Sequence, residues 1–426
     1  MSYRHGAFFD EAPTSLVTPV EVDSALPVVV GTAPVHTLPK DTAVPVNEPR
    51  LIYTFEDFVS QFGKVPEGEN RHDYTLSEFA EVFIGRYATA PMVCINVFDP
   101  AKHVKTIPAE NGEGEAQTVA DVSAVSPTDI IGGVDTSGKR TGLALVEKVF
   151  PLFRKVPGLI CAPGFSATPS VGIAIGAACK GISGHFKAMG IVDMPQSIAR
   201  PEEAPAWVND NNLTDENLLL FFGTPTYGGA EEYGSVHLAG VIAQRDGEND
   251  GIPFWSPSNK RMLCEGLVHN GAELALTPVE AANLNGNGII TGINMIGGLV
   301  VWGDQTACYP GVTDVKDASL PVRRMFNWIG NTLVLTAWQK VSNPLRRRLI
   351  SSVTDTFNLW LNGLAAREYI LGGRVTFEAK DNSTLDLMGG KVSFHVYVTP
   401  PTAAREIMFT LEYDPSYLST LFSDAA

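Results

Sequence analysis

The sequence lacks any run of eighteen consecutive apolar residues, which is the length that a membrane-spanning helix requires. Its first six residues also lack the basic-then-apolar pattern of a secretory signal. We therefore expect a cytoplasmic product with no segment inserted in a membrane. Positive charge is scarce too, because the 426 residues carry a net charge of −16. Such a balance argues against a general binder of nucleic acid or of anionic membranes.

Cysteine and histidine are few and follow no ligand pattern. The five cysteines, an odd number, contain no CxxC pair and lie mostly in apolar surroundings. Buried free thiols in a reducing compartment are therefore expected rather than disulfides or a zinc site. The eight histidines are scattered singly and no HExxH motif occurs, so no metal ligands are expected.

Catalytic signatures are also missing. Asp193 at the end of a predicted strand and His237 on a predicted helix could belong to a hydrolase, but no GxSxG elbow accompanies them. Gly286 and Gly288 precede a β-branched segment instead of opening a helix, which favours a turn over a nucleotide loop. We expect no catalytic residue and no cofactor, and a hydrolase on an α/β scaffold remains the alternative.

What is present is an alternation of strand and helix patterns. Residues 1–24 contain two prolines and no helical periodicity, which predicts an extended arm. Strand-like and helix-like segments alternate over 25–98 and again over 138–312, a rhythm typical of a doubly wound α/β sheet. Residues 99–137 are polar and small, which predicts a small β-rich insertion. Within the second α/β stretch, Ser235 is predicted to cap a helix, and residues 277–280 form a capping box.

The last hundred residues differ, and 313–400 are predicted to form an α+β domain. Apolar residues at helical spacing predict one helix up to about residue 341 and a second beginning after Pro344. Segments 374–380, 391–398 and 406–413 alternate apolar and polar residues, as half-buried antiparallel strands do. Because two prolines precede the third segment, 401–426 are predicted to form a C-terminal strand arm.

Basic residues concentrate in this region. Between residues 321 and 375 the net charge is +6, which leaves −22 for the remainder of the chain. Such asymmetry indicates either a face that meets an acidic partner or a solvated helix face.

Several short sequence segments, taken in their order along the chain, resemble the contractile tail sheath family of phages and phage-like bacteriocins. They are 3–6 through 13–14 to 28–34, 47–52, 156–164, 192–195, 256–259, 284–289, 302–306 and 322–324. The resemblance implies a central subtilisin-like domain without catalytic residues, and therefore no enzyme. It implies a helical homo-oligomer around an inner tail tube protein, with baseplate and tail terminator proteins as further partners. The location implied is a virion tail or phage-like particle assembled in the bacterial cytoplasm. The short 99–137 insertion departs from longer family members.

The same resemblance implies that strands from both ends join neighbouring subunits. The N-terminal candidates are Thr14, Ser15, Leu16, Val17, Thr18 and Val20, and the C-terminal ones are Ile407, Phe409, Leu411 and Tyr413. Both segments could instead pair within their own subunit. Arg346, Arg347 and Arg348, expected just inside the helix after Pro344, are the candidates for contact with the tube. A non-contractile tube or capsid subunit is a further alternative.

Overall fold

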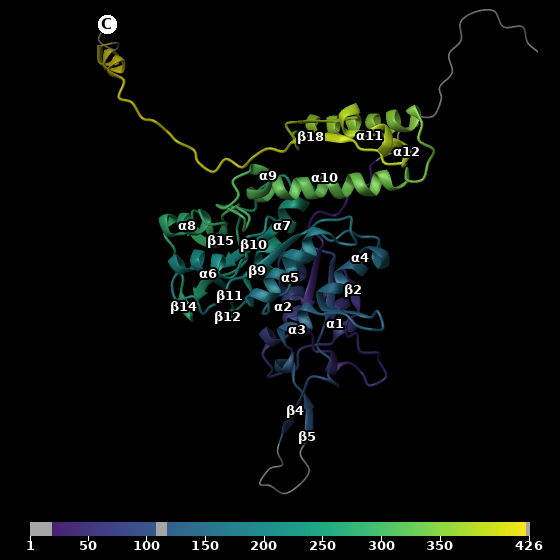
Figure 1. The fold of residues 1–426 in the computed structure, drawn as a ribbon. Coiled ribbons are helices and arrows are strands. Elements are labelled where there is room, and N and C mark those ends of the chain that lie inside the picture. The colour runs from purple at the N-terminus through teal and green to yellow at the C-terminus, as the bar shows by residue number, and fades with distance from the viewer. Residues whose placement is uncertain (1–18, 108–116, 423–426) are drawn as a thin grey trace, which may run out of the picture.

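An eight-stranded sheet organises the centre of the molecule (Figure 1). The structure, a computed structural model, describes residues 19–107 and 117–422. The strand order is β16-β15-β10-β9-β8-β1-β3-β2, with the two edge strands β2 and β16 antiparallel to their neighbours. The strands are β1 (Pro27–Gly31), β2 (Pro49–Ile52), β3 (Met92–Asn96), β8 (Leu159–Cys161), β9 (Met189–Asp193), β10 (Leu218–Phe222), β15 (Ile289–Met295) and β16 (Gly298–Trp302).

The central strands are buried on both faces because their sequences are almost uninterrupted apolar runs, such as Leu218–Phe222 in β10. Helices cover both faces. A Cβ on Gly190 of β9 would lie 2.4 Å from Cγ2 of Ile175 in α5 (Pro169–Lys180). Asp193, three residues further along the same strand, bonds Ser235 in α7 (Gly234–Gly247). Since side chains alternate along a strand, α5 and α7 lie on opposite faces.

In the described parts of the chain, seven shorter α-helices complete the body. They are α1 (Phe55–Phe62), α2 (Thr75–Ala80), α3 (Pro127–Ile131), α4 (Val146–Phe153), α6 (Ala204–Asp210), α8 (Pro278–Asn285) and α9 (Val315–Ala318). The predicted capping box at α8 is confirmed: the Glu280 amide donates to Thr277 Oγ1 over 3.3 Å, and the Thr277 amide donates to Glu280 Oε2 over 2.8 Å. The predicted cap at Ser235 is wrong. Tyr233 holds the N-cap position, and the Ser235 side chain is drawn away to Asp193.

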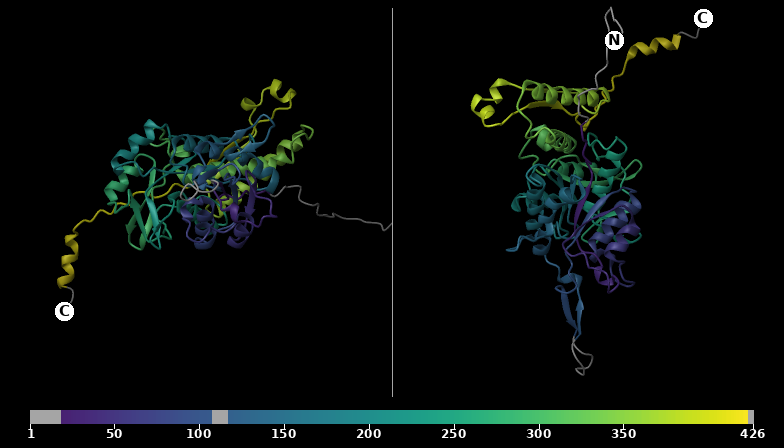
Figure 2. Two further views of the ribbon diagram at one scale, coloured as in Figure 1. Left: turned by 90° about the horizontal axis from the view of Figure 1, so that it is seen from below. Right: turned by 90° about the vertical axis from the view of Figure 1, so that its right-hand side faces the viewer.

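Three small antiparallel sheets lie outside the central sheet in the described part of the body. One is the hairpin β4 (Val104–Ile107) and β5 (Gln117–Ala120), and the second is β6 (Gly133–Val134) with β7 (Arg140–Thr141). The third has four strands, β11 (Thr224–Tyr227), β12 (Ala230–Glu231), β13 (Gly266–His269) and β14 (Ala272–Glu273). The β4–β5 hairpin projects from the end of the molecule opposite to the C-terminal segment (Figures 1 and 2).

A C-terminal layer lies across one end of the body (Figure 1). It contains α10 (Leu320–Trp338), α11 (Arg347–Ala366), α12 (Thr384–Met388) and a two-stranded sheet of β17 (Gly372–Thr376) and β18 (His395–Thr399). The second long helix begins later than predicted, because Ser342 adopts a φ of +65° and the turn after α10 extends to Arg346. Strand β17 ends before residue 380, because Ala379–Asp381 turns into a 3-10 helix.

The layer is joined to the body by a continuous core and by one buried ion pair. Trp328 of α10 packs against Trp360 of α11 with ring centroids 5.5 Å apart, within the same apolar cluster as the central sheet. Arg324 of α10 donates to both carboxylate oxygens of Asp246 in α7. A helix and a sheet far apart in the sequence therefore form a single packed unit.

Candidate assembly surfaces

The N-terminal segment passes beneath the long helices before it enters the sheet. The Val20 amide donates to Thr336 Oγ1 over 2.9 Å, and Trp328 Nε1 donates to the Val22 carbonyl over 3.0 Å. Trp360 Nε1 donates to Glu21 Oε1 over 2.9 Å. Three side chains from α10 and α11 therefore fix the path of the segment that leads into β1.

Of the six N-terminal candidates, Val20 is the one within the described residues, and its side chain is 45% exposed. Thr14, Ser15, Leu16, Val17 and Thr18 lie outside the described residues. Their proposed strand therefore stays a prediction.

The C-terminal candidates lie on an extended segment that leaves the molecule (Figure 2). Residues 406–413 pair with no strand in the described parts of the chain. Ile407, Phe409, Leu411 and Tyr413 are between 71% and 95% exposed. The alternative that this segment pairs within its own subunit is therefore not seen in the described residues, and its donation to a neighbour stays a prediction. Met408, on the opposite side of the alternation, is exposed as well. Beyond it, a 3-10 helix (Pro415–Phe422) also exposes Tyr417, Leu418 and Leu421.

An open sheet edge and an apolar groove lie in the C-terminal layer. Strands β17 and β18 pair with each other and with no third strand in the described ranges. On β17 the Asn358 side chain of α11 takes up both backbone groups of Val375, so β18 presents the more open edge. Beside this sheet lies a groove of about 670 Å³. Its lining is mainly apolar and includes Leu333, Ala337, Leu349, Val353, Val392 and Phe394. Sequence reasoning missed this groove, since its walls come from four separate segments.

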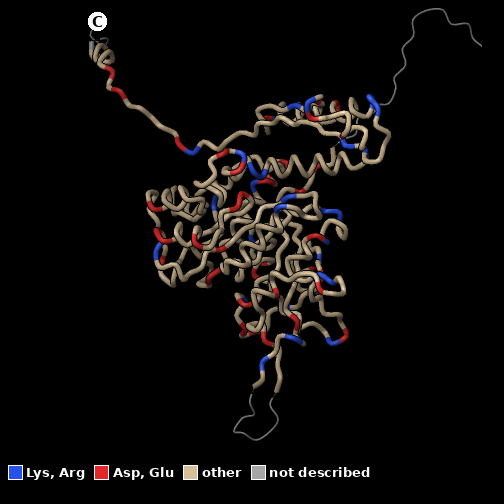
Figure 3. The backbone as a smooth tube through the Cα atoms, viewed as in Figure 1, with Lys and Arg blue, Asp and Glu red and all other residues tan. Residues whose placement is uncertain are grey.

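The three arginines proposed to meet the tube lie together at the start of α11. Arg346 is the N-cap residue, not an interior residue as expected, and Arg347 and Arg348 occupy the first turn. All three are exposed, and none forms an ion pair with another described residue. Figure 3 shows basic segments in the layer of α11, on the side away from the central sheet.

Two other basic residues of the same window do not face solvent. Arg323 pairs with Asp317 over 2.9 Å, and Arg324 is bound to Asp246. The side chain of Arg324 is only 3% exposed. The net positive charge counted along the sequence therefore overstates the charge available to a partner.

A buried ion cluster holds α7 against the segment around α2. Glu232, fully buried, accepts from Arg71 over 2.6 Å and from both terminal nitrogens of Arg86 over 2.6 and 2.9 Å. Its remaining partner is His237, whose Nε2 lies 2.9 Å from Oε2. Burial opposes ionisation of Glu232, but the hydrogen bonds from His237, Arg86 and Arg71 outweigh it and hold its pKa well below the usual range.

His237 is engaged on both ring nitrogens. Burial lowers its pKa, so the ring is neutral near pH 7. We assign the proton to Nε2, which donates to Glu232, while Nδ1 accepts from the Tyr87 hydroxyl 2.9 Å away. The Tyr87 hydroxyl in turn accepts from the Leu263 amide. The polar atoms of His237 and the Tyr87 hydroxyl are therefore all engaged in hydrogen bonds that join separate segments of the body.

Asp193, the other residue of the hydrolase alternative, lies in a different set of contacts. Its Oδ1 accepts from the Ser235 amide over 2.6 Å, and its Oδ2 accepts from the hydroxyls of Ser235 and Ser166. Burial raises its pKa although these hydrogen bonds oppose the rise. His237 hydrogen bonds to neither serine. The aspartate binds the first turn of α7, as a capping group does.

Neither thiols nor carboxylates gather into a ligand set. Cys94, Cys161, Cys179 and Cys308 are buried and Cys264 is half-buried, all of them unpaired. Burial raises the pKa of Cys264 to about 12, so this thiol is not a nucleophile near neutral pH. Within residues 19–107 and 117–422, no group of three or more His, Cys, Asp or Glu side chains could hold a metal ion. No helix of that part is long and apolar enough to cross a bilayer.

An α/β body with open sheet edges, an exposed apolar strand segment and no assembled reaction centre in its described part is typical of a self-assembling structural subunit. Comparison with known proteins leads to the same class. The chain is 27% identical over 316 residues to the tail sheath protein of Burkholderia phage BcepMu, an alignment that covers 71% of this chain and 65% of the phage protein. It is 25% identical, over 440 aligned residues and 100% of both chains, to a Pseudomonas aeruginosa protein named as a prophage major tail sheath protein.

Solved structures share the fold. A chain in the cryo-EM structure of the anti-feeding prophage baseplate gives a TM-score of 0.66 at 16% identity, covering 97% of this chain and 100% of that one. A chain in the contracted sheath complex of PVC, an extracellular contractile injection system, gives 0.66 at 15% identity, covering 98% and 99%. No family model matches the chain. The curated relatives are thus tail sheath proteins, and the solved structures that share the fold come from contractile injection systems, so the comparisons support a sheath subunit.

Proposed function

We propose that this chain polymerises helically around an inner tube and contracts to drive the tube through the envelope of a target cell. The observation that carries the proposal is the exposed 406–413 segment, whose apolar side chains pack against no other described residues, in a subunit that also offers an open strand edge on β18. A neighbour's arm that adds a strand to β18 would pair the backbone groups of that edge and cover the apolar side chains of the arm. Main-chain hydrogen bonds would supply affinity, and the alternating side chains would set the register.

The geometry of the donor and acceptor supports a head-to-tail contact. The donor segment extends away from the C-terminal layer, whereas the acceptor edge is on β18 within that layer. Since donor and acceptor are different surfaces of the same chain, each copy can bind one neighbour and be bound by another. Such a contact builds a helical polymer when it does not close into a ring. The N-terminal segment that includes Val20 would supply the second connecting strand.

Within this proposal the remaining parts have assigned roles. The sheet within 138–312, together with 25–98, would be a subtilisin-like scaffold that carries no catalysis, and 99–137 a projecting insertion. Residues 313–400 would face the tube, with 1–24 and 401–426 as arms. Arms that stay bound would let the bodies rotate and repack without dissociation, so an extended lattice could convert to a contracted one. The particle would be a phage tail or phage-like particle assembled in the host cytoplasm, with baseplate and terminator proteins at its ends.

The basic start of α11 supports a contact with an acidic tube. Arg347 and Arg348 lie at the helix end that already carries positive partial charge, and no acidic residue lies in that first turn. Each such arginine is unfavourable by about 0.3–1 kcal/mol at a helix N-terminus unless an anion compensates it. An acidic surface on the tube would provide that compensation.

The tube contact is tested by reversing these charges. The variant Arg346→Glu/Arg347→Glu/Arg348→Glu should reduce co-sedimentation of sheath with tube, whereas Lys391→Glu, on an exposed residue elsewhere in the layer, should leave it unchanged. Raising the salt concentration should weaken the wild-type contact and narrow the difference between wild type and the triple variant. Equal co-sedimentation of the triple variant and wild type would remove the basis for a tube-facing role.

Electron microscopy of truncated chains tests the arm model. Removal of 406–426 or of 1–20 should leave a folded subunit that forms no long tubes. Replacing Phe409 and Leu411 by Asp should have the same effect as the C-terminal deletion, while Glu406→Gln and Glu412→Gln should not. Normal tubes from either truncated chain would contradict donation from that end. A monodisperse monomer with esterase or peptidase turnover would instead favour the hydrolase alternative, and closed shells or narrow tubes the capsid or tube alternative.

A further inference from the structure

The base of the C-terminal arm touches the body at one polar point. Arg405 Nε donates to Asp304 Oδ1 over 2.8 Å. From residue 400 to residue 413 no backbone group hydrogen bonds to the body in the described structure. From residue 406 onward every described side chain is exposed. The ion pair therefore stands at the last point where the arm meets its own subunit.

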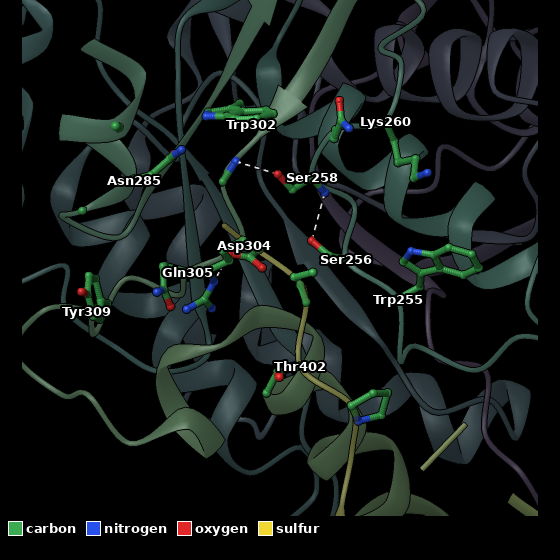
Figure 4. Close-up of a pocket in the computed structure, with 18 of the residues that line it drawn as sticks. Trp255, Ser256, Ser258, Lys260, Asn285, Trp302, Asp304, Gln305, Tyr309 and Thr402 are labelled. Carbon is green, nitrogen blue, oxygen red and sulfur yellow. Dashed lines mark hydrogen bonds and ion pairs between the residues drawn. The ribbon is translucent and has the colours of Figure 1, made fainter. Parts of the chain in front are cut away.

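Packing holds the arm base only up to Ala403, because Pro400 is buried and Pro401 and Ala403 are half-buried, whereas Ala404 and Arg405 are exposed. A pocket of about 760 Å³ lies between residues 401–405 on one side and the body on the other. Figure 4 shows Asp304 and Thr402 facing the same opening, with Trp302 and Trp255 on the body side. Since Ala404 and Arg405 border this open space, the Arg405–Asp304 contact is what keeps the end of the arm base near the body.

The acceptor of this contact is placed at a junction. Asp304 follows β16, and its carbonyl accepts from the amide of Leu320, the first residue of α10. Its side chain is 7% exposed, while that of Arg405 is 47% exposed. Burial raises the pKa of Asp304, and the charge and hydrogen bond of Arg405 oppose that rise. Without Arg405 the buried carboxylate would have no side-chain partner, so the body favours the anchored arm.

We infer that Asp304 anchors the C-terminal arm through Arg405 and so sets the direction in which the arm leaves the free subunit. An anchored arm has fewer conformations to lose when it joins a neighbour, because its free length begins at residue 406 instead of residue 404, the first exposed residue after the half-buried Ala403. Pre-organisation of this kind lowers the entropic cost of association. The effect on assembly rests on the proposed strand donation, whereas the anchor itself does not.

Trypsin measures the anchor directly, since the protease must take the free Arg405 side chain into its specificity pocket. In Asp304→Asn the rate of cleavage after Arg405, followed by mass spectrometry of the released 406–426 fragment, should rise by about two- to tenfold. The matched control Asp386→Asn, which removes an exposed carboxylate paired with Lys391, should leave that rate unchanged. An unchanged rate in Asp304→Asn would overturn the anchor.

A second variant covers the case in which Asp304→Asn fails to fold. Arg405→Gln removes the other partner, and cleavage after Glu406 by a glutamate-specific protease should accelerate by a similar factor relative to wild type. Arg405→Lys should give an intermediate rate. If Arg405→Gln is cleaved no faster than wild type, the anchor is overturned by this route too.

The assembly consequence is read separately in subunits that polymerise. The concentration at which tubes first form should rise about two- to tenfold in Arg405→Gln, with Arg405→Lys between it and wild type. Faster cleavage with an unchanged onset concentration would overturn the pre-organising role while leaving the anchor. If wild type forms no tubes, the proposed function fails, and the cleavage rates still decide the anchor.

Discussion

Removal of the Arg324 guanidinium should lower the free energy of unfolding more than removal of any exposed charged group. Arg324 and Asp246 are each 3% exposed at the side chain, and they are joined by contacts of 2.9 and 2.5 Å. Arg324 also donates to the Ser24 carbonyl over 3.1 Å. In Arg324→Met the carboxylate of Asp246 would stay buried with only the Ser24 hydroxyl as a donor. Removing one partner of a buried pair costs about 3–5 kcal/mol, which is the loss we expect in the free energy of unfolding.

The double variant Arg324→Met/Asp246→Leu distinguishes the loss of the ion pair from the cost of leaving the Asp246 carboxylate buried and unpaired. Because no charge is left buried, most of the lost free energy should return. Urea denaturation followed by tryptophan fluorescence measures both, since Trp328 lies one turn along α10. The control Arg200→Met removes a pair whose partners are 72% and 45% exposed and should leave the urea midpoint almost unchanged. A loss below about 1 kcal/mol in the single variant, or no recovery in the double variant, would refute the reasoning.

Three further changes test the body. Because the pKa of Glu232 is lowered in the folded protein, its ionised carboxylate contributes fully to stability above the unfolded-state pKa of about 4.3, and this contribution is lost progressively as the pH falls below that value. Glu232→Gln should therefore flatten the dependence of the urea midpoint on pH between 5 and 3. Thr277→Ala should lower the free energy of unfolding in urea by about 1 kcal/mol and speed amide hydrogen exchange in α8. An unchanged exchange rate would show that the Thr277 cap does not stabilise this helix. Gly190→Ala should cost about 1–3 kcal/mol by overpacking, whereas Gly181→Ala, with no atom within 4 Å of the new methyl, should not; equal effects would contradict the packing argument.

Local patterns were sufficient for most of the body. The apolar run at β1 predicted a buried strand, and the Thr277–Glu280 spacing predicted the start of α8, because both signals arise from neighbours in the sequence. Contacts between residues far apart in the sequence could not be predicted from local patterns. Arg324 was counted as available positive charge, yet its partner Asp246 is 78 residues away and both are buried.

The C-terminal arm shows a different limit. Alternation over residues 406–413 predicts a half-buried strand, but it does not say which molecule supplies the other strands. In this chain that segment is exposed. The Arg405–Asp304 contact was missed for the same reason, since a lone arginine after a proline pair carries no signal of a carboxylate 101 residues earlier.

The course of the N-terminal segment has a mechanical consequence. A pull on it passes through the bonds of Trp328 and Thr336 and then along β1, which is hydrogen-bonded on both sides, to β3 and β8. Tension along such a strand loads its hydrogen bonds in shear, all at once. A pull on the C-terminal arm meets a single ion pair and then β18, the outer strand of a two-stranded ribbon. The two ends of one subunit therefore differ in tensile strength, and under a rising force the first rupture is expected at the C-terminal side.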